Sequence, residues 1–188
     1  MTRRLFGLLA IAVVAAACGA PRLSVSEYAV VVEDATDAYI AESKALSGTF
    51  QESVEDEIAS IAESGEGDLL ELASKVTSRE TVQYLALLED AMARYLEVLN
   101  AVVPPDSLSG AHEAYVAALQ SVRASMPVTR TGVEQATDLA GIQTAITSSG
   151  FSDGQLRLQA ACADLESAVR SHGHGIDLGC TPTTVSSG

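Results

Sequence analysis

The sequence contains a serine, an aspartate and a histidine in the chain order used by α/β-hydrolases. Residues 150 to 154 read Gly-Phe-Ser-Asp-Gly, which matches Gly-x-Ser-x-Gly, and Asp164 and His172 follow. That motif requires a strand running into the serine and a central sheet behind it. The residues before Gly150 have helical spacing instead, so we expect Ser152 to cap a helix. We find no defensible catalytic set and predict that the protein is not an enzyme.

His112 is the next residue whose surroundings could support chemistry. Hydrophobic spacing places it on one helix face with Leu108 and Tyr115. A histidine inside a helical bundle can bind a metal or haem, or act as a general base. The Glu-x-x-His motif of bundle metal sites is not present, since Ser109 stands three residues earlier. Two interpretations stay open: a core histidine hydrogen-bonded to Tyr95 or Tyr115, or a metal or ligand site lined by His112, Tyr115 and Tyr95.

Two polar clusters have weaker metal-binding patterns. His172 and His174 flank a glycine near the end of an expected helix, where the helix dipole favours a protonated imidazole. Two histidines are too few ligands for a transition metal without further donors. Residues 63 to 68, which read Glu-Ser-Gly-Glu-Gly-Asp, lack the alternating acids of a calcium loop. We therefore predict no bound cofactor.

Helices must position these residues, because apolar residues recur at helical spacing through nearly the whole chain after residue 25. The first helix is expected from about Ser26 to Glu63, with a bend or interruption at Gly48. A Gly-Glu-Gly segment at 65–67 then breaks the pattern. The next segment reaches Val103. Its residues 77–80, Thr-Ser-Arg-Glu, fit a capping box, so a short helix is expected to precede the long one.

Proline and glycine divide the rest of the chain. A third helix is expected from about Ser107 to Ser125, with Asp106 as its N-cap and a stop or kink at Pro127. A short helix follows over residues 138–147. The last helix is expected to begin at a box over residues 152–155, which a hydrophobic staple brackets, and to bury an apolar stripe before Gly173. The staple pairs Phe151 with Leu156, and the stripe contains Leu158, Cys162, Leu165 and Val169.

These elements predict an all-α fold, an up-and-down helical bundle of about four main helices with one or two minor helices. The bundle is expected to occupy residues 26–180. Residues 181–188 are small and polar, so we expect a disordered tail there.

The charge of the chain limits its partners. It has 188 residues, with 11 Lys+Arg against 25 Asp+Glu and a net charge of -14. A chain of this kind lacks the clustered Lys and Arg that nucleic-acid binding needs, so we predict no nucleic-acid partner. Residues 27–97 hold 17 acids and 4 bases, and no Lys or Arg occurs from Glu52 to Glu71. This half is expected either to serve solubility alone or to attract a basic protein or a cation.

The first 17 residues have the parts of a secretory signal peptide. Arg3 and Arg4 precede 13 uncharged, mostly apolar residues, and three alanines precede Cys18. Such a stretch spans only about 20 Å as a helix, too little for a hydrocarbon core of about 30 Å. One interpretation is a plain signal peptide that is cut near Ala17 or Ala20, with Cys18 incidental.

The Ala-Ala-Ala-Cys segment resembles the lipobox of bacterial lipoproteins. In that family the cysteine becomes the first residue of the mature chain and carries a diacylglycerol. The resemblance implies lipidation at Cys18, a tether over residues 18–25, and a location on the outer face of the cytoplasmic membrane. Two or more acyl chains would anchor the protein stably.

Cys162 and Cys180 remain once Cys18 is set aside. An even number of cysteines in an oxidising compartment predicts a disulfide. The bridge would fix the C-terminal segment onto the last helix. A redox or metal-binding thiol pair is the alternative, although the sequence has no Cys-x-x-Cys.

The mature part has a second, less specific resemblance. Pro-Pro-Asp at 104–106, His112, Tyr115, Cys162 and the segment 177–180, Asp-Leu-Gly-Cys, look similar to small helical lipoproteins of unassigned function from high-GC bacteria. That resemblance implies no activity. The sequence predicts a membrane-anchored, non-enzymatic binding or scaffold module that acts through its acidic helical surface. The alternative is a metal-binding or haem-binding bundle centred on His112.

Overall fold

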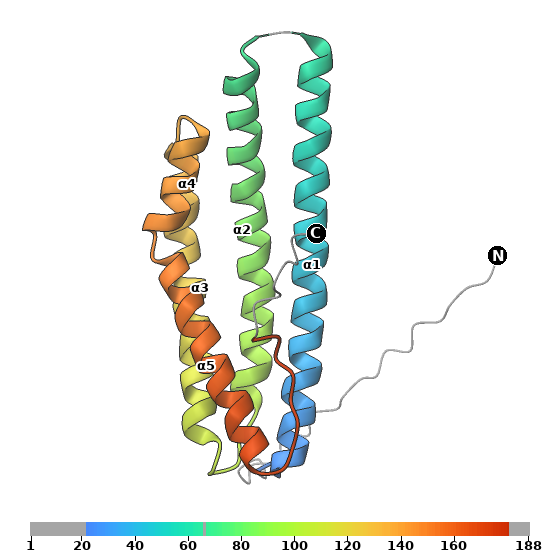
Figure 1. Cartoon of the computed structure of the whole chain (residues 1–188), viewed down its shortest axis with the longest axis vertical. Helices are drawn as coiled ribbons and strands as arrows, with labels where there is room; N and C mark the ends of the chain where they lie inside the picture. Colours follow the sequence, from blue (N-terminus) through green and yellow to red (C-terminus); the bar gives the residue numbers. More distant parts are fainter. Residues whose placement is uncertain (1–21, 66, 181–188) are drawn as a thin grey trace, which may run out of the picture.

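Five helices make up most of the described residues, 22–65 and 67–180, in a computed structural model of the chain (Figure 1). They are α1 (Val25–Ser64), α2 (Leu69–Ala101), α3 (Ser109–Gln135), α4 (Leu139–Ser148) and α5 (Phe151–Ser171). No strand occurs in these residues. The predicted all-α fold is confirmed. The predicted signal peptide, Cys18 and the tail 181–188 lie outside the described residues.

The helices form a bundle that is open along one side. α1 and α2 make a long antiparallel hairpin, α3 packs against α2, and α5 packs against α3, while α4 packs beside the C-terminal part of α3. α1 and α5 are not packed extensively against each other. Between them runs the segment 172–180, which leaves the end of α5 and turns back along the bundle (Figure 1). We call residues 173–180 the strap.

The ends of α1 match the sequence expectation closely. Ser24 caps the helix, since its side chain accepts from the Glu27 amide while the Glu27 carboxylate accepts from the Ser24 amide at 2.8 Å. Gly65 ends the helix in the left-handed conformation, with φ of 63°, which costs glycine little because it has no Cβ. Gly48 does not interrupt the helix, so the expected interruption there was wrong.

The expected break inside the second helical region is not present, because α2 runs unbroken from Leu69. Asp68 is the cap, since its side chain accepts from the Leu70 amide at 2.9 Å. The residues that resembled a capping box make contacts between helices instead. Ser78 donates to the Val133 carbonyl of α3 at 2.9 Å, and the buried Glu80 accepts from Ser53 of α1 at 3.0 Å.

α3 differs from the expectation at both ends. Its N-cap is Leu108 and not Asp106, which forms an exposed ion pair with Arg22. Pro127 lies inside the helix, which continues to Gln135. Proline removes one backbone donor and normally breaks a helix. Here the residues around it bury a continuous stripe that keeps the helix intact: Met126, Thr129 and Val133.

The start of α5 also differs from the position expected from the sequence. Gly150, in the left-handed conformation with φ of 80°, is the N-cap, and Ser152 lies within the first turn. The Phe151 amide is satisfied by the Ser149 hydroxyl at 3.3 Å. Leu156 is 66% exposed, so it does not form the expected staple. The expected stripe is correct for Cys162, Leu165 and Val169, which are buried, whereas Leu158 is half-buried.

Asp138 caps α4, as its carboxylate accepts from the Gly141 amide at 2.7 Å. We expect Asp138→Ala to cost about 1 kcal/mol of stability, because the amide loses its acceptor. Urea unfolding and hydrogen exchange at Gly141 measure the loss. Asp106→Ala is the matched control, because an exposed ion pair contributes little. Equal losses in the two variants would contradict the capping assignment.

Within residues 22–65 and 67–180, none of the helices combines the length and the apolar character needed to cross a membrane. The hydrophobic core lies among the lower halves of α1, α2, α3 and α5 in Figure 1. Its largest fully buried side chains are Tyr28, Leu99, Leu108, Leu119, Met126 and Leu165.

Candidate functional site

A chain of hydroxyl groups crosses the core between α1, α2 and α3. The Thr36 hydroxyl lies 2.6 Å from that of Tyr95, which lies 3.0 Å from that of Tyr115. Thr36 donates its proton to the Val32 carbonyl at 2.8 Å, so Tyr95 must donate to Thr36. Tyr115 must then donate to Tyr95, since each hydroxyl has one proton. The Tyr115 oxygen keeps acceptor capacity, and no donor to it occurs among the described residues.

His112 is buried beside this chain and is hydrogen-bonded on two sides. Its Nδ1 lies 2.9 Å from the Tyr28 hydroxyl, and the backbone of Leu99 provides a second hydrogen bond. The expected partners, Tyr95 and Tyr115, were therefore wrong; the partner is Tyr28. A neutral ring that accepts from Tyr28 and donates to Leu99 satisfies both groups. A metal or haem iron would have to displace one of these bonds.

Burial lowers the pKa of His112, against the opposing effects of Glu113 and the Leu99 backbone. The unfolded chain therefore takes up this proton more readily as pH falls below about 6.5. We expect stability to be highest above that pH and to decline below it, by at most about 1.4 kcal/mol per pH unit. Urea unfolding at pH 7.5, 6.5 and 5.5 tests this.

The non-titrating variant His112→Gln should lose the decline between pH 6.5 and 5.5. His172→Gln, which removes an exposed imidazole, is the control, and this variant should still lose stability between pH 6.5 and 5.5. A decline that survives in His112→Gln would assign it to other groups.

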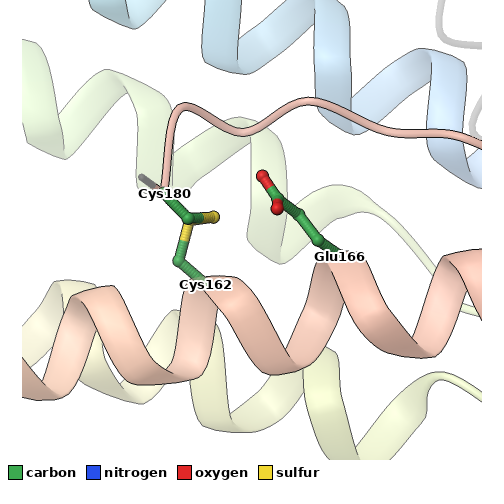
Figure 2. A group of neighbouring side chains, drawn as sticks. All are labelled: Cys162, Glu166 and Cys180. Atoms are coloured by element: carbon green, nitrogen blue, oxygen red, sulfur yellow. A yellow bond between two sulfur atoms is a disulfide. The ribbon is translucent and has the colours of Figure 1, made fainter. Parts of the chain in front are cut away.

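A disulfide joins α5 to the strap, as expected from the cysteine count. Cys162 and Cys180 are bonded, with their Cα atoms 5.5 Å apart. Figure 2 shows the Glu166 side chain, one turn along α5, directed toward the strap. Its carboxylate accepts from the Leu178 amide at 2.9 Å, and Glu33 of α1 accepts from the Asp177 amide at 3.4 Å. The strap is thus held by one covalent bond and two carboxylates.

Cys162, Glu166 and Cys180 also bring three metal-binding side chains within 4.8 Å of one another. Both sulfurs are used in the disulfide, and the carboxylate is used by the strap amide. A cysteine binds a metal ion through its free thiolate, which neither cysteine has while the disulfide is formed. In this state the cluster is therefore a structural clamp.

A groove lies between α1 and α5, with α3 as its floor and the strap as one wall. Its volume is about 340 Å³, and we call it the seam groove. Its lining side chains include Thr36, Tyr39 and Ile40 of α1, Tyr115 and Leu119 of α3, and Leu158 of α5. None of its lining residues is charged. Tyr39 stacks on Tyr95, with ring centroids 5.0 Å apart and planes 7° apart.

The three residues proposed from sequence as ligand-lining lie in one region of the core but do not line one groove. Tyr115 lines the seam groove, whereas Tyr95, which is hydrogen-bonded to it, lines a smaller groove between α1 and α2. His112 lines neither. Sequence reasoning missed Thr36 and Leu158 as groove residues. Their helical spacing indicates that each lies on a buried helix face. Nothing in the neighbouring sequence indicates that α1 and α5 are not packed against each other there.

The remaining sequence motifs are not assembled into sites. Ser152 and Asp164 lie on α5 and His172 is its C-cap, so neighbours in the set are 12 and 8 positions apart along one helix. At 1.5 Å per residue they stand about 18 and 12 Å apart, too far for a catalytic triad. His172 is exposed, and neither it nor His174 belongs to a three-ligand cluster in the described part of the chain.

The α1–α2 hairpin extends beyond the other helices (Figure 1). Ser78 lies beside the last turn of α3, and we call the part of the hairpin beyond it, residues 52–65 and 67–75, the hairpin tip. Two ion pairs occur there, Glu57–Arg79 and Glu71–Lys75. Its other described acids are exposed and form no ion pair: Glu52, Glu55, Asp56, Glu63 and Asp68, the last of which caps α2. The tip therefore concentrates unneutralised negative charge.

Comparison with protein-family models, with curated proteins and with solved structures finds no match to this chain.

Proposed function

We propose that this protein is a membrane-tethered binding module that presents an acidic hairpin tip to a basic partner. The observation that carries the proposal is the position of the tip. α1 begins seven residues after Cys18, and its 40 residues extend about 60 Å to the opposite end. A lipid on Cys18 would hold the other end of the bundle at the bilayer, so the tip would project outward.

The charge at the tip supports a basic protein partner. Five exposed acids without ion pairs, Asp68 among them, attract cations over about one Debye length, which is near 8 Å at physiological salt. Anionic lipid headgroups would repel the same surface. The tip is therefore better suited to a partner in the aqueous space than to the membrane.

A metal-binding or haem-binding centre at His112 is not favoured by the geometry, because both sides of the ring are hydrogen-bonded in the core. Catalysis is not favoured either, since the serine, aspartate and histidine of the hydrolase-like motif stand far apart on one helix. We therefore propose a non-enzymatic role.

Charge neutralisation at the tip tests the binding role. The test variant combines Glu52→Gln, Glu55→Gln, Asp56→Asn and Glu63→Gln. The matched control combines Asp90→Asn, Glu97→Gln, Glu113→Gln and Asp164→Asn, which are exposed acids elsewhere. The probe is a decalysine peptide, measured by calorimetry at several salt concentrations.

We expect the tip variant to weaken decalysine binding about tenfold and to flatten its salt dependence, since locally summed charge sets such affinities. The control variant should weaken it less, despite the same change in net charge. Equal weakening would mean that net charge alone attracts cations and would overturn the tip as a binding surface.

The tether has its own test. The intact mass of the detergent-extracted protein should equal a chain that starts at Cys18 plus its acyl groups. Cys18→Ser should release the protein from the membrane fraction. An unmodified cysteine, or a mature chain that starts beyond it, would refute the tether.

A further inference from the structure

We propose that the seam groove binds an uncharged molecule that has an aliphatic chain and one hydrogen-bond donor. This site is separate from the hairpin tip and does not depend on the function proposed for it. Four features carry the inference: an incompletely packed seam, a covalently held wall, a lining without charge, and a buried acceptor.

The seam is open although aliphatic side chains make up much of its lining, beside the uncharged polar side chains of Gln155 and Gln159. α1 and α5 each pack on a neighbour but not extensively on each other. A volume of about 340 Å³ remains between them, within the range of small-molecule sites. Leu119 is buried at the floor, while Ile40 and Leu158 are half-buried at the sides. A ligand chain would bury the remaining apolar area, worth about 25 cal/mol per Å².

The wall formed by the strap is fixed before any ligand arrives. The disulfide attaches Cys180 to α5, and the Glu166 carboxylate holds the Leu178 amide. Leu178 and Cys180 are both buried and both line the groove. A preformed wall avoids the entropy cost of ordering a loop on binding.

The lining selects against charged ligands. It contains no Lys, Arg, Asp, Glu or His that could pair with a charged group. The nearby carboxylates of Glu33 and Glu166 are occupied by strap amides. A charged group moved from water into this groove would therefore lose hydration without gaining an opposite charge.

The hydroxyl chain gives the groove a directional preference. Thr36 and Tyr115 both line it. Because Thr36 donates to Val32 and Tyr115 donates to Tyr95, both protons point away from a ligand. The Tyr115 oxygen can still accept. A ligand hydroxyl or amide N–H satisfies it, whereas an ether or ester oxygen does not.

The experiment compares four probes with the same chain: 1-decanol, decyl methyl ether, decanoate and decylammonium. The protein is the chain from residue 19 onward, which contains every described helix, without detergent. Binding is followed by calorimetry and by NMR shifts of the Ile40, Leu119 and Leu158 methyl groups. We expect saturable binding of 1-decanol with shifts at these methyls, and at least tenfold weaker binding of both ions.

Three variants make the test specific. Leu158→Glu places a charge in the groove and should abolish 1-decanol binding, whereas Leu156→Glu, on the exposed face of the same helix, should not. Tyr115→Phe should reduce the affinity for 1-decanol to that for the ether. Circular dichroism confirms that each variant is folded.

Three results would overturn the proposal: equal affinity for all four probes, binding without saturation, or equal loss in the two leucine variants. The hairpin-tip variant should bind 1-decanol normally, so failure of one proposal is distinguishable from failure of the other.

Discussion

The double variant Cys162→Ser, Cys180→Ser should be less stable than the natural chain by about 3 kcal/mol, because the bridge closes a loop with a sequence separation of 18. The reason is chiefly that the unfolded chain regains freedom. Both sulfurs are buried, so two serine hydroxyls would also lose hydration in the core. Urea unfolding under non-reducing conditions measures the difference.

A thiol reductant supplies the control. It should lower the stability of the natural chain by a similar amount and leave the double variant unchanged. Hydrogen exchange should locate the change in the strap, where the Leu178 and Gly179 amides lose protection first. If reduction left the midpoint of the natural chain unaltered, the bridge would not be constraining the unfolded state.

The same variant connects the disulfide to the seam groove. Without the bridge, the strap is still held by the carboxylates of Glu33 and Glu166 and by the burial of Ile176 and Leu178 in the core. The part-buried hydrogen bond to Glu166 contributes about 1.5 to 3 kcal/mol, and the long, exposed one to Glu33 contributes less, so the strap should stay partly in place. Affinity for 1-decanol should therefore fall without being lost.

Hydrophobic periodicity predicted the long helices because each buries a stripe of apolar residues along its length. The helix starts were less predictable, because several residues can cap. Asp106 and Asp138 both precede an expected helix, yet only Asp138 reaches a free amide in the structure. The start of a helix depends on where packing begins, and residues 77–80 resemble a cap but lie within α2.

The candidate site was less predictable than the helices. His112 bonds to Tyr28, which is 84 positions away, and no local pattern identifies that partner. The seam groove arises because α5 stands away from α1, a relation between two helices at opposite ends of the chain. Cys162 and Cys180 were predictable as a pair because counting cysteines needs no knowledge of packing.

A single truncation in α5 tests how the core depends on that helix. Leu165 is fully buried and joins the main core, whereas Leu156 is 66% exposed. We expect Leu165→Ala to cost about 3 kcal/mol, through lost burial and the cavity left behind. Leu156→Ala removes the same atoms from the surface and should change stability by about 0.5 kcal/mol or less.

Urea unfolding of both variants measures the contrast, and the seam groove gives each of two outcomes a structural meaning. A small loss for Leu165→Ala would mean that the helices close onto the cavity, as an open seam would allow. In that case α5 would move relative to the strap, and the methyl shifts of Leu158 would change. A large loss with unchanged Leu158 shifts would mean that α3 and the disulfide hold α5 in place. We expect the second result, because Gly154 lets α5 approach α3 closely. A Cβ atom at this position would lie only 3.2 Å from a methyl carbon of Val122.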